Sequence, residues 1–279
     1  MPELPEIETI CNYLKLSIIN HNIEQVIVRK ALLRWPINLE LNKILQNNTI
    51  KNIYRRAKYL LIECHNPYNS SHGHLIIHLG MSGKLSILDK SIPVTKHDHL
   101  DLVLQNNTVL RYNDPRRFGA ILWTTTNPLE HFLLKNLGPE PFDPLCTASY
   151  LLKKANRKTL SIKQFIMDNK IIVGVGNIYA NEALFRSRIH PLSITKNLKL
   201  MHMQKLITTI KQILQQAIKQ GGTTLKDFFD PTGKAGTFSQ TLQVYSKANQ
   251  SCKICNTKIR QIKLGQRSTF FCEKCQVII

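Results

Sequence analysis

The first hydrophobic pattern in the chain has the period of an α-helix. Its apolar residues recur three or four positions apart, which places them on one helical face: Ile7, Ile10, Cys11, Leu14 and Ile18. Pro5 suits a first helical turn, and the carboxylates of Glu6 and Glu8 suit the positive end of the helix dipole. We therefore predict an amphipathic helix that begins almost at the N-terminus and holds the terminal residues against a core.

Between residues 23 and 126 the pattern changes to a period of two, which is typical of half-buried strands. Asn, Gly, Asp and Pro residues form turn signals between the alternating stretches. We expect strands at residues 26–29, 50–64, 75–79, 85–88, 100–104, 109–112 and 120–123. Together they predict a β-sandwich or flattened barrel with the N-terminal helix against it.

A proline-rich segment separates this region from a helical one. Residues 138–144 contain three prolines, which is typical of a linker. Helical periodicity follows at residues 145–155, 161–168, 177–186 and 198–220. The expected fold class is α+β with two domains and a final Cys-rich module. The expected boundaries are residues 1–136 for the N-terminal domain, 137–147 for the linker, 148–246 for the helical domain and 247–279 for the module.

Charge narrows the class of partner. The chain has 38 Lys and Arg against 18 Asp and Glu, a formal net charge of +20. Such an excess predicts a polyanionic partner, most simply nucleic acid, bound with strongly salt-dependent affinity. A membrane-surface role is disfavoured because no single basic amphipathic helix carries the excess. We also expect no membrane-spanning or secretory segment, because no apolar run approaches about 20 residues and the N-terminus lacks a signal pattern.

Four of the seven cysteines form a C-x2-C-x16-C-x2-C pattern: Cys252, Cys255, Cys272 and Cys275. Two such pairs can give one metal ion four thiolates, which predicts a single structural zinc ion. Leu264-Gly265 between the pairs predicts a hairpin turn, with Arg267 near its tip. The remaining cysteines are interpreted as reduced core residues of a cytoplasmic protein: Cys11, Cys64 and Cys146.

The N-terminus itself is a candidate nucleophile. Removal of Met1 would leave Pro2 as a secondary amine next to the Glu3 carboxylate. A model α-amino group has a pKa of about 7.7–8.0, against about 10.4 for lysine, so more of it is unprotonated at neutral pH. Such an amine can attack an electrophilic carbon and form an iminium. The alternative is an ordinary frayed terminus, which the predicted early helix disfavours.

Further motifs place polar groups at turns. Residues 174–179 join two helices, and Asn177 at a helix start can aim amide donors at a phosphate, although a tight turn explains the glycines equally well. Residues 55–58 and 114–119 put cations beside aromatic residues and suit phosphate contact and a wedge between bases. The pairs at 72–74 and 97–99 are His-x-His patterns that could chelate a metal, but we interpret them as polar loop and strand residues.

Several of these motifs, in this order along the whole chain, closely resemble the bacterial formamidopyrimidine-DNA glycosylases, a family of bifunctional DNA glycosylases and AP lyases that also includes endonuclease VIII. The segments that carry the resemblance are residues 2–6, 56–59, 78–83, 114–119, 174–180 and the four terminal cysteines. The resemblance implies a helix–two-turn–helix DNA-binding domain followed by a zinc finger. It also implies a monomeric cytoplasmic repair enzyme that binds double-stranded DNA with oxidised bases or abasic sites.

The resemblance also implies a role for each matched residue. Pro2 would be the nucleophile and Glu3 its acid/base partner, with Glu6 shaping the site. The residues implied to hold phosphates are Lys58, which would also act in catalysis, and His78, Asn177, Tyr245 and Arg267. Those implied to fill the gap left by the extruded nucleotide are Met81, Arg116 and Phe118. Lys163 and Lys226 would support the pocket for the damaged base, Lys226 at the start of a loop that closes over it.

The implied activity is excision of oxidised purines (8-oxoguanine and formamidopyrimidines), followed by β- and δ-elimination. Ser246-Lys247 and Thr237 depart from the family pattern and concern the loop over the lesion. An endonuclease VIII-type enzyme for oxidised pyrimidines is an alternative, which Leu4 and the Arg116/Phe118 pair disfavour. A non-catalytic DNA-binding protein would not require the Pro2-Glu3 terminus, and a proline tautomerase would explain neither the charge nor the finger.

Overall fold

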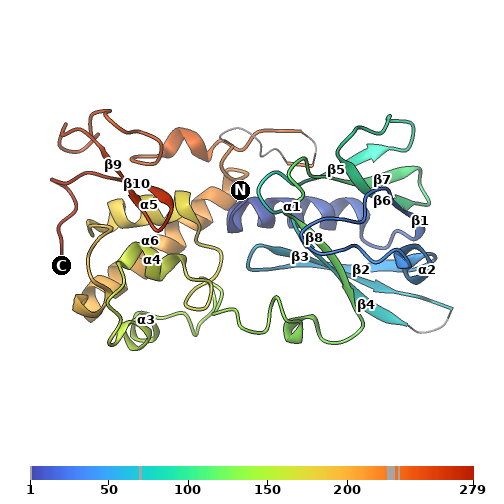
Figure 1. Ribbon diagram of the computed structural model, residues 1–279, viewed down its shortest axis with the longest axis horizontal. Helices are drawn as coiled ribbons and strands as arrows, with labels where there is room; N and C mark the ends of the chain where they lie inside the picture. Colours follow the sequence, from blue (N-terminus) through green and yellow to red (C-terminus); the bar gives the residue numbers. More distant parts are fainter. Residues whose placement is uncertain (1, 69–70, 225–229, 232) are drawn as a thin grey trace. The chain divides into compact units, whose positions relative to one another are not determined.

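The computed structural model describes residues 2–68, 71–224, 230–231 and 233–279 (Figure 1). The chain packs into two compact units. The first comprises Met1–Lys135 together with Gln220–Thr237, and the second comprises Asn136–Lys219 together with Phe238–Ile279. The segment Gln220–Thr237 thus belongs to the N-terminal unit although it follows the longest helix of the second unit.

The N-terminal unit contains two four-stranded antiparallel sheets and confirms the predicted sandwich with a helix. One sheet has the order β1-β6-β7-β5, formed by Ile23–Val28, Asp98–Leu104, Thr108–Asn113 and Lys84–Asp89. The other has the order β2-β3-β4-β8, formed by Thr49–Arg56, Tyr59–His65, His72–His78 and Ala120–Thr124. The single strand expected at residues 50–64 is two strands, because the chain turns at Ala57, whose φ is +54°.

The helix α1 spans Leu4–Ile18 and contributes its apolar face to the core of this unit. Alternate residues of both sheets meet that face, since side chains along a strand point to opposite sides. The core includes Ile7 and Leu14 from the helix, Ile62 from β3 and Leu102 from β6, each at most 2% exposed. Burial of one such side chain stabilises the fold by roughly 1.5–3 kcal/mol. The short elements α2, at Leu41–Leu45, and η1, at Pro128–Glu130, complete the unit.

The second unit is helical and ends in a hairpin. Its helices are α3 at Ala148–Ala155, α4 at Ile162–Met167, α5 at Asn177–Ser187 and α6 at Leu200–Lys219, with short turns η2 at Thr195–Asn197 and η3 at Phe238–Thr241. The side chains of Thr147 and Ser161 cap α3 and α4 by accepting from Tyr150 N and Gln164 N, respectively. α6 is followed by Gly221 and Gly222, whose φ angles are +71° and +82°, as the sequence predicts.

The hairpin pairs β9, Arg260–Leu264, with β10, Arg267–Phe271. Leu264 lies opposite Arg267, so the turn consists of Gly265 and Gln266, one residue beyond the predicted Leu264-Gly265. Both turn residues have positive φ, +53° and +62°, which matches the type I′ turn favoured by twisted hairpins. In the described part of the chain, no helix is long and apolar enough to span a bilayer.

Candidate functional site: a terminal proline, two paired loops and a zinc finger

The N-terminal residues are held firmly by the start of α1. Pro2 and Glu3 are both buried, and Glu3 is the N-cap of the helix. Glu3 and Glu6 form a capping box, in which each side chain accepts from the backbone N–H of the other residue. The distance from Glu3 N to Glu6 Oε2 is 2.8 Å. The terminus is therefore a fixed part of the core and not a frayed end.

Glu6 also connects the terminus to the returning segment of the same unit. Its Oε1 accepts a hydrogen bond from Thr223 N at 2.7 Å, and the carboxylate is 1% exposed. Further along that segment, Gly236 N donates to Thr224 Oγ1 at 2.8 Å, and Thr237 N donates to Gln220 O at 3.0 Å. Lys226 lies outside the described residues. Glu6 thus positions both the terminal dipeptide and the base of the segment that contains Lys226.

Lys58 and His78 lie close together beside the second sheet. Lys58, in the β2–β3 turn, is 8% exposed, and His78 ends β4 opposite Tyr59. Burial first, and then the charges of Lys58 and Arg34, lower the pKa of His78 to about 4. Nδ1 of His78 accepts from Gly80 N at 3.0 Å, so the proton of the neutral ring lies on Nε2. His78 is therefore a neutral N–H donor next to a cation, which suits a phosphate oxygen.

Two loops of the N-terminal unit pack backbone against backbone. They are residues 79–83, after β4, and residues 114–119, before β8. A Cβ added to Gly80 would lie 2.5 Å from the carbonyl carbon of Phe118, so only glycine allows this approach. Gly119 is equally constrained, since a Cβ there would lie 1.8 Å from Tyr112 Oη. Gly80 thus allows the two loops to pack closely, and Gly119 allows the second loop to pack closely on Tyr112 and on the backbone of His78.

The buried carboxylate of Asp114 holds this pair of loops together. Asp114 is fully buried, and its Oδ1 accepts from Ser82 Oγ at 2.7 Å and from Arg116 N at 3.3 Å. Its Oδ2 accepts from Gly119 N at 2.9 Å and from Tyr112 Oη at 3.2 Å. A carboxylate that satisfies four donors fixes the backbone of both loops.

The tips of these loops carry the predicted wedge residues. Met81 is 38% exposed and Phe118 is 47% exposed, although both are large and apolar. The guanidinium of Arg116 lies over the Phe118 ring, 4.7 Å from its centroid, a cation–π contact. The structure thus brings Met81, Arg116 and Phe118 to one pair of rigid loops, with apolar surface left open to solvent.

In the second unit, Asn177 and Arg267 are brought together by the hairpin. Asn177 is the first residue of α5, and its Nδ2 donates to Ser268 O at 3.0 Å. Asn181, one turn later, donates to Asn177 O at 2.6 Å and accepts from Phe270 N at 2.7 Å. Arg267, which adjoins Ser268, is exposed. The helix start and the hairpin tip therefore present an amide and a guanidinium from one local framework.

Lys163 has an unexpected place. The side chain on α4 is 1% exposed, and its Nζ donates to Ser268 O at 3.0 Å and to Thr269 Oγ1 at 2.7 Å. These contacts join α4 to the same hairpin strand that Asn177 contacts. No local pattern predicts this contact, because the partners are more than a hundred residues apart in the chain.

Tyr245 is positioned by a buried carboxylate that the sequence analysis missed. Glu182 on α5 is fully buried and accepts from the backbone N–H groups of Gln243, Val244 and Tyr245, the last at 2.9 Å. The ring of Tyr245 packs edge-on against Phe270 with centroids 5.2 Å apart. A charged residue within the largely apolar stretch from Ile178 to Leu184 was the available signal, since a buried carboxylate needs donors.

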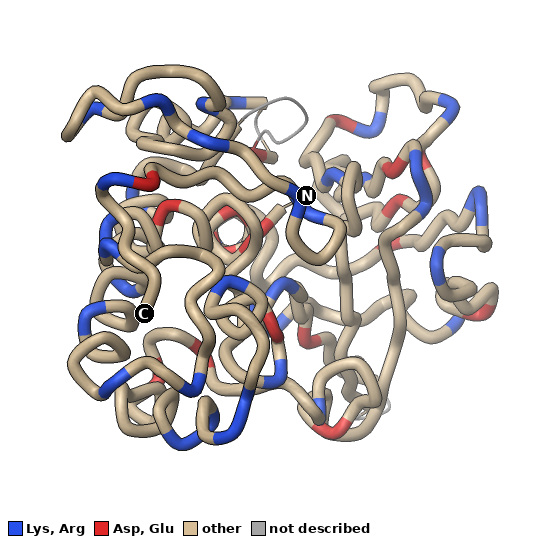
Figure 2. Tube along the Cα trace, turned by 60° about the vertical axis from the view of Figure 1, so that its left-hand side comes forward, with Lys and Arg blue, Asp and Glu red and all other residues tan. Residues whose placement is uncertain are grey.

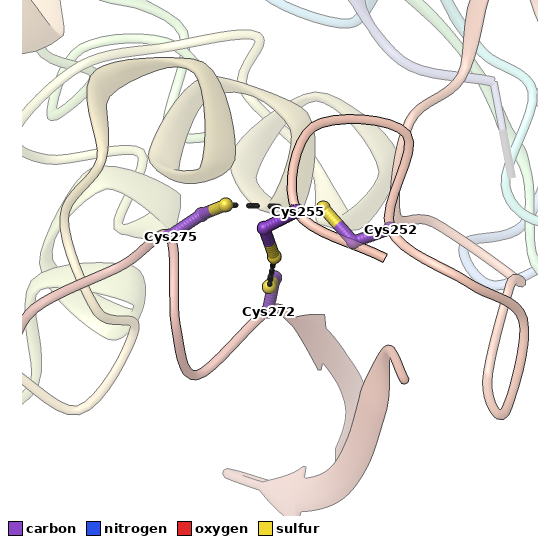
Figure 3. A group of neighbouring side chains, drawn as sticks. All are labelled: Cys252, Cys255, Cys272 and Cys275. Carbon is purple, nitrogen blue, oxygen red and sulfur yellow. Dashed lines mark hydrogen bonds between the residues drawn. The ribbon is translucent and has the colours of Figure 1, made fainter. Parts of the chain in front are cut away.

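The four cysteines converge from two separate loops (Figure 3). Their Sγ atoms all lie within 4.8 Å of one another, with Cys252 to Cys275 at 3.8 Å and Cys255 to Cys272 at 3.4 Å. A tetrahedral zinc ion with Zn–S bonds of about 2.3 Å separates its sulfurs by about 3.8 Å. The arrangement fits one zinc ion with no open position, so the metal is structural, as predicted.

Lys and Arg residues are distributed along the trace of both units (Figure 2). Together with the net charge of +20, this distribution favours contact with an extended polyanion. The chain is strongly basic and has a buried proline at position 2, exposed apolar side chains on two packed loops, and a zinc finger. These features define a class: a zinc-finger enzyme that acts on nucleic acid.

Comparison with known proteins identifies the family. Residues 1–121 match the formamidopyrimidine-DNA glycosylase N-terminal domain, residues 137–229 match its H2TH domain, and residues 249–277 match the zinc finger found in FPG and IleRS. The chain is 52% identical over 276 residues to the formamidopyrimidine-DNA glycosylase of Vibrio vulnificus strain YJ016, covering 99% of this chain and 100% of that protein. It is 49% identical to that of Haemophilus influenzae strain PittEE, covering 99% of each.

Comparison with solved structures points to the same family. The chain is similar to a Lactococcus lactis FPG mutant in complex with DNA containing Fapy-dG, with a TM-score of 0.89, 34% identity and 99% of each chain covered. It is also similar to Lactococcus lactis Fpg in complex with DNA containing an abasic site, with a TM-score of 0.88, 34% identity and the same coverage. The chain belongs to the formamidopyrimidine-DNA glycosylase family, which confirms the resemblance seen in the sequence.

Proposed function

We propose that this protein excises oxidised purines, namely 8-oxoguanine and formamidopyrimidines, from double-stranded DNA and then cleaves the strand at the abasic site. The observation that carries the proposal is the buried Pro2-Glu3 terminus, fixed by the capping box with Glu6, in a member of this family. Relatives in this family have been solved with DNA that contains Fapy-dG or an abasic site.

The proposed chemistry uses the amine of Pro2 once Met1 is removed. The target nucleotide must leave the base stack, at a cost of a few kcal/mol, because C1′ is hidden in the duplex. The Pro2 nitrogen then forms a bond to C1′ while the bond from C1′ to the base breaks, and the base departs with that electron pair and a proton. Glu3 protonates the ring oxygen as the sugar opens to an iminium. Loss of a C2′ proton then breaks the C3′–O bond, and a second elimination breaks the C5′–O bond.

The proposed DNA contacts follow from the geometry of each unit. Lys58, the Nε2–H of His78 and the amide of Asn177 suit phosphate oxygens, and Tyr245 and Arg267 extend that set. Met81 and Phe118 suit the space left by the extruded nucleotide, with Arg116 facing the orphaned cytosine. We propose that Lys163 supports the site because its hydrogen bond to Ser268 O fixes the backbone next to Arg267. We also propose that Lys226 supports the pocket for the damaged base.

Borohydride trapping tests the nucleophile. The protein with Pro2 exposed should become covalently bound to duplex DNA containing 8-oxoguanine opposite cytosine, because borohydride reduces the iminium to a stable amine. The same chain with two extra residues before Pro2 should bind this DNA but should not be trapped. Equal trapping of both proteins would refute the terminal-amine mechanism, and peptide sequencing of the adduct should place it on Pro2.

A second candidate, an activity on oxidised pyrimidines, has one observation in its favour. A Lactococcus lactis Fpg relative with 34% identity was solved with DNA containing an oxidised pyrimidine. Single-turnover excision from matched duplexes separates the two candidates. We expect faster release of 8-oxoguanine than of an oxidised pyrimidine, and the reverse order would assign the protein to the pyrimidine-directed class.

We propose that the protein acts in the cytoplasm as a monomer and associates with the nucleoid when bound to DNA. The basic charge and the family support DNA as the partner. The three cysteines outside the finger are buried free thiols, which suits a reducing compartment. Light scattering during size-exclusion chromatography should give the mass of one chain, and fractionation of cells should recover the protein with soluble and DNA-bound material.

A further inference from the structure

The strands β3 and β4 are neighbours in the second sheet (Figure 1). Four polar side chains at one end of this pair form a patch on the face of the sheet that points away from the core. Antiparallel pairing puts them opposite one another in two cross-strand pairs, Glu63 with His74 and His65 with His72. Their strand neighbours Cys64 and Leu75 belong to the core of the N-terminal unit. Because side chains alternate along a strand, the four share the opposite face. We call this set the histidine patch.

The distances within the histidine patch approach those of a metal site. Nε2 of His65 lies 3.0 Å from Glu63 Oε1, and the rings of His65 and His72 have centroids 5.6 Å apart. Two imidazoles bound tetrahedrally to one zinc ion, with Zn–N bonds of about 2.0–2.1 Å, have centroids roughly 5 Å apart. The observed separation of 5.6 Å is close to that value, and the His72 side chain is exposed.

His74 supplies a second and independent observation. Its Nδ1 is buried and has no hydrogen-bond partner among the described residues. Burial lowers the pKa of His74, which favours the neutral ring that metals bind. The other charged or titratable groups acting on the ring are Glu63, His65 and His72, all members of the patch, and Tyr54 packs against it with centroids 5.9 Å apart. A metal ion would use a ring lone pair that the protein leaves unsatisfied.

We propose that Glu63, His65, His72 and His74 form a second metal site, for a borderline divalent ion such as Zn²⁺. The donor set of imidazoles and one carboxylate suits zinc and its neighbours in the first transition row. When Nε2–H of His65 donates to Glu63 Oε1, Nδ1 of His65 and Oε2 of Glu63 both keep lone pairs for the ion.

The histidine patch is less preorganised and more exposed to solvent than the cysteine cluster. The four Sγ atoms already converge, whereas the patch needs side-chain rotation. The side chain of His65 is 44% exposed, so the ion would be open to solvent and would exchange. Such an ion would bridge β3 and β4 and tighten the ends of these two strands. This role is separate from base excision, since no patch residue belongs to the proposed catalytic or DNA-binding set.

Zinc stoichiometry tests the proposal. The full-length protein with its finger loaded is dialysed against micromolar free Zn²⁺, and bound zinc is measured by elemental analysis. We expect roughly two ions per chain for the unaltered protein and one for the double variant His72→Asn/His74→Asn. The matched control His131→Asn/His202→Asn also removes two imidazoles and should still bind two.

Equal zinc content in the unaltered protein and the patch variant would overturn the proposal, as would equal loss in the control. Base excision by the patch variant should be unchanged, which shows that it is folded. A single variant, Glu63→Gln, should retain the fold and weaken the second ion several-fold. Amide exchange in β3 and β4 should slow on addition of zinc in the unaltered protein only, and a zinc effect that persists in the patch variant would place the ion elsewhere.

Discussion

At the scale of single residues, three buried carboxylates each hold backbone segments in place, in different parts of the chain. Glu6, Asp114 and Glu182 are each at most 1% exposed, and each accepts from several donors, including backbone N–H groups. Burial of a carboxylate is unfavourable unless it is hydrogen-bonded, so each fixes the segments that donate to it. These segments carry Pro2, which is the proposed nucleophile, the proposed wedge residues, and Tyr245, respectively.

Replacement of Glu6 by glutamine tests this idea at the nucleophile. The amide group would present donors to Glu3 N or Thr223 N, each of which is itself a donor. An unsatisfied buried polar group costs about 1–3 kcal/mol, so we expect the single-turnover excision rate to fall roughly tenfold or more, with little change in DNA affinity. Glu24→Gln, at a half-exposed ion pair with Lys90, is the matched control and should leave the rate unchanged. Full activity of the Glu6→Gln protein would show that Glu6 does not position the catalytic site.

The lowered pKa of His78 predicts that the folded protein loses stability in acid. Its folded-state pKa of about 4 lies below the ordinary value of 6.5, so the unfolded chain binds a proton more readily. Stability contributed by the neutral ring is therefore fully present above about pH 6.5 and is lost as pH falls towards 4, by up to about 3 kcal/mol. His78→Asn keeps an acceptor for Gly80 N and cannot titrate.

The measurement is urea unfolding at a series of pH values. The unaltered protein should lose more stability between pH 6.5 and 4 than His78→Asn, and the two curves should run parallel above pH 7. NMR of the imidazole should show one neutral form, protonated at Nε2, throughout the neutral range. A normal titration midpoint for His78 would contradict the buried, cation-flanked environment.

At the scale of elements, the hairpin β9–β10 serves as a support as well as a contact surface. Asn177 from α5 and Lys163 from α4 both donate to Ser268 O on β10, and Asn181 accepts from Phe270 N. The cysteine cluster closes the base of this hairpin, because Cys272 directly follows β10. We therefore expect zinc to act on DNA binding indirectly, through the contacts of the hairpin with α4 and α5.

Removal of zinc should therefore disrupt the hairpin before the rest of the chain. With a chelator, or in Cys272→Ser, we expect rapid amide exchange in β9 and β10 and loss of DNA affinity by a hundred-fold or more, because a four-thiolate site supplies folding free energy directly. The sheets of the N-terminal unit, which have a separate core, should keep their exchange protection. Equal protection of the hairpin with and without metal would show that the metal is dispensable.

At the scale of the whole molecule, charge decides how DNA affinity responds to salt. Most of the +20 net charge is spread over exposed side chains, and each cation that contacts a phosphate releases counterions. The neutral donors proposed at His78 and Asn177 would position the DNA without that release. The salt slope of binding therefore counts the cationic contacts and not all contacts.

Arg267→Gln tests this distinction. If Arg267 contacts a phosphate, the slope of log K against log salt should become shallower by about one, with a loss of affinity that is similar for damaged and undamaged duplexes. Fluorescence anisotropy over a range of salt concentrations measures both. Lys43→Gln, an exposed residue paired with Glu40, is the control and should leave the slope unchanged. An unchanged slope for Arg267→Gln would place this side chain away from the phosphates.

Much of the fold followed from local pattern. The apolar face of α1, the alternation of the strands and the Gly221-Gly222 stop at α6 act within a few residues, so they can be read without tertiary information. The strand expected at 50–64 is two strands because Ala57 adopts a positive φ. Glycine is the usual signal for such a turn in a sequence, and this position is an alanine. The contacts of Lys163 could not be predicted for a different reason: its partners Ser268 and Thr269 are distant in the chain.

The zinc ligands, the candidate nucleophile, the fold class and the family could all be predicted from the amino-acid sequence, because each depends on residue types at fixed spacing. Tertiary structure alone decided that Glu6 ties the terminus to Thr223, that Asp114 joins two loops and that Glu182 orders the backbone before Tyr245. The reason is physical: a buried carboxylate is stable only where folding brings donors to it, and those donors come from segments whose meeting no local pattern specifies.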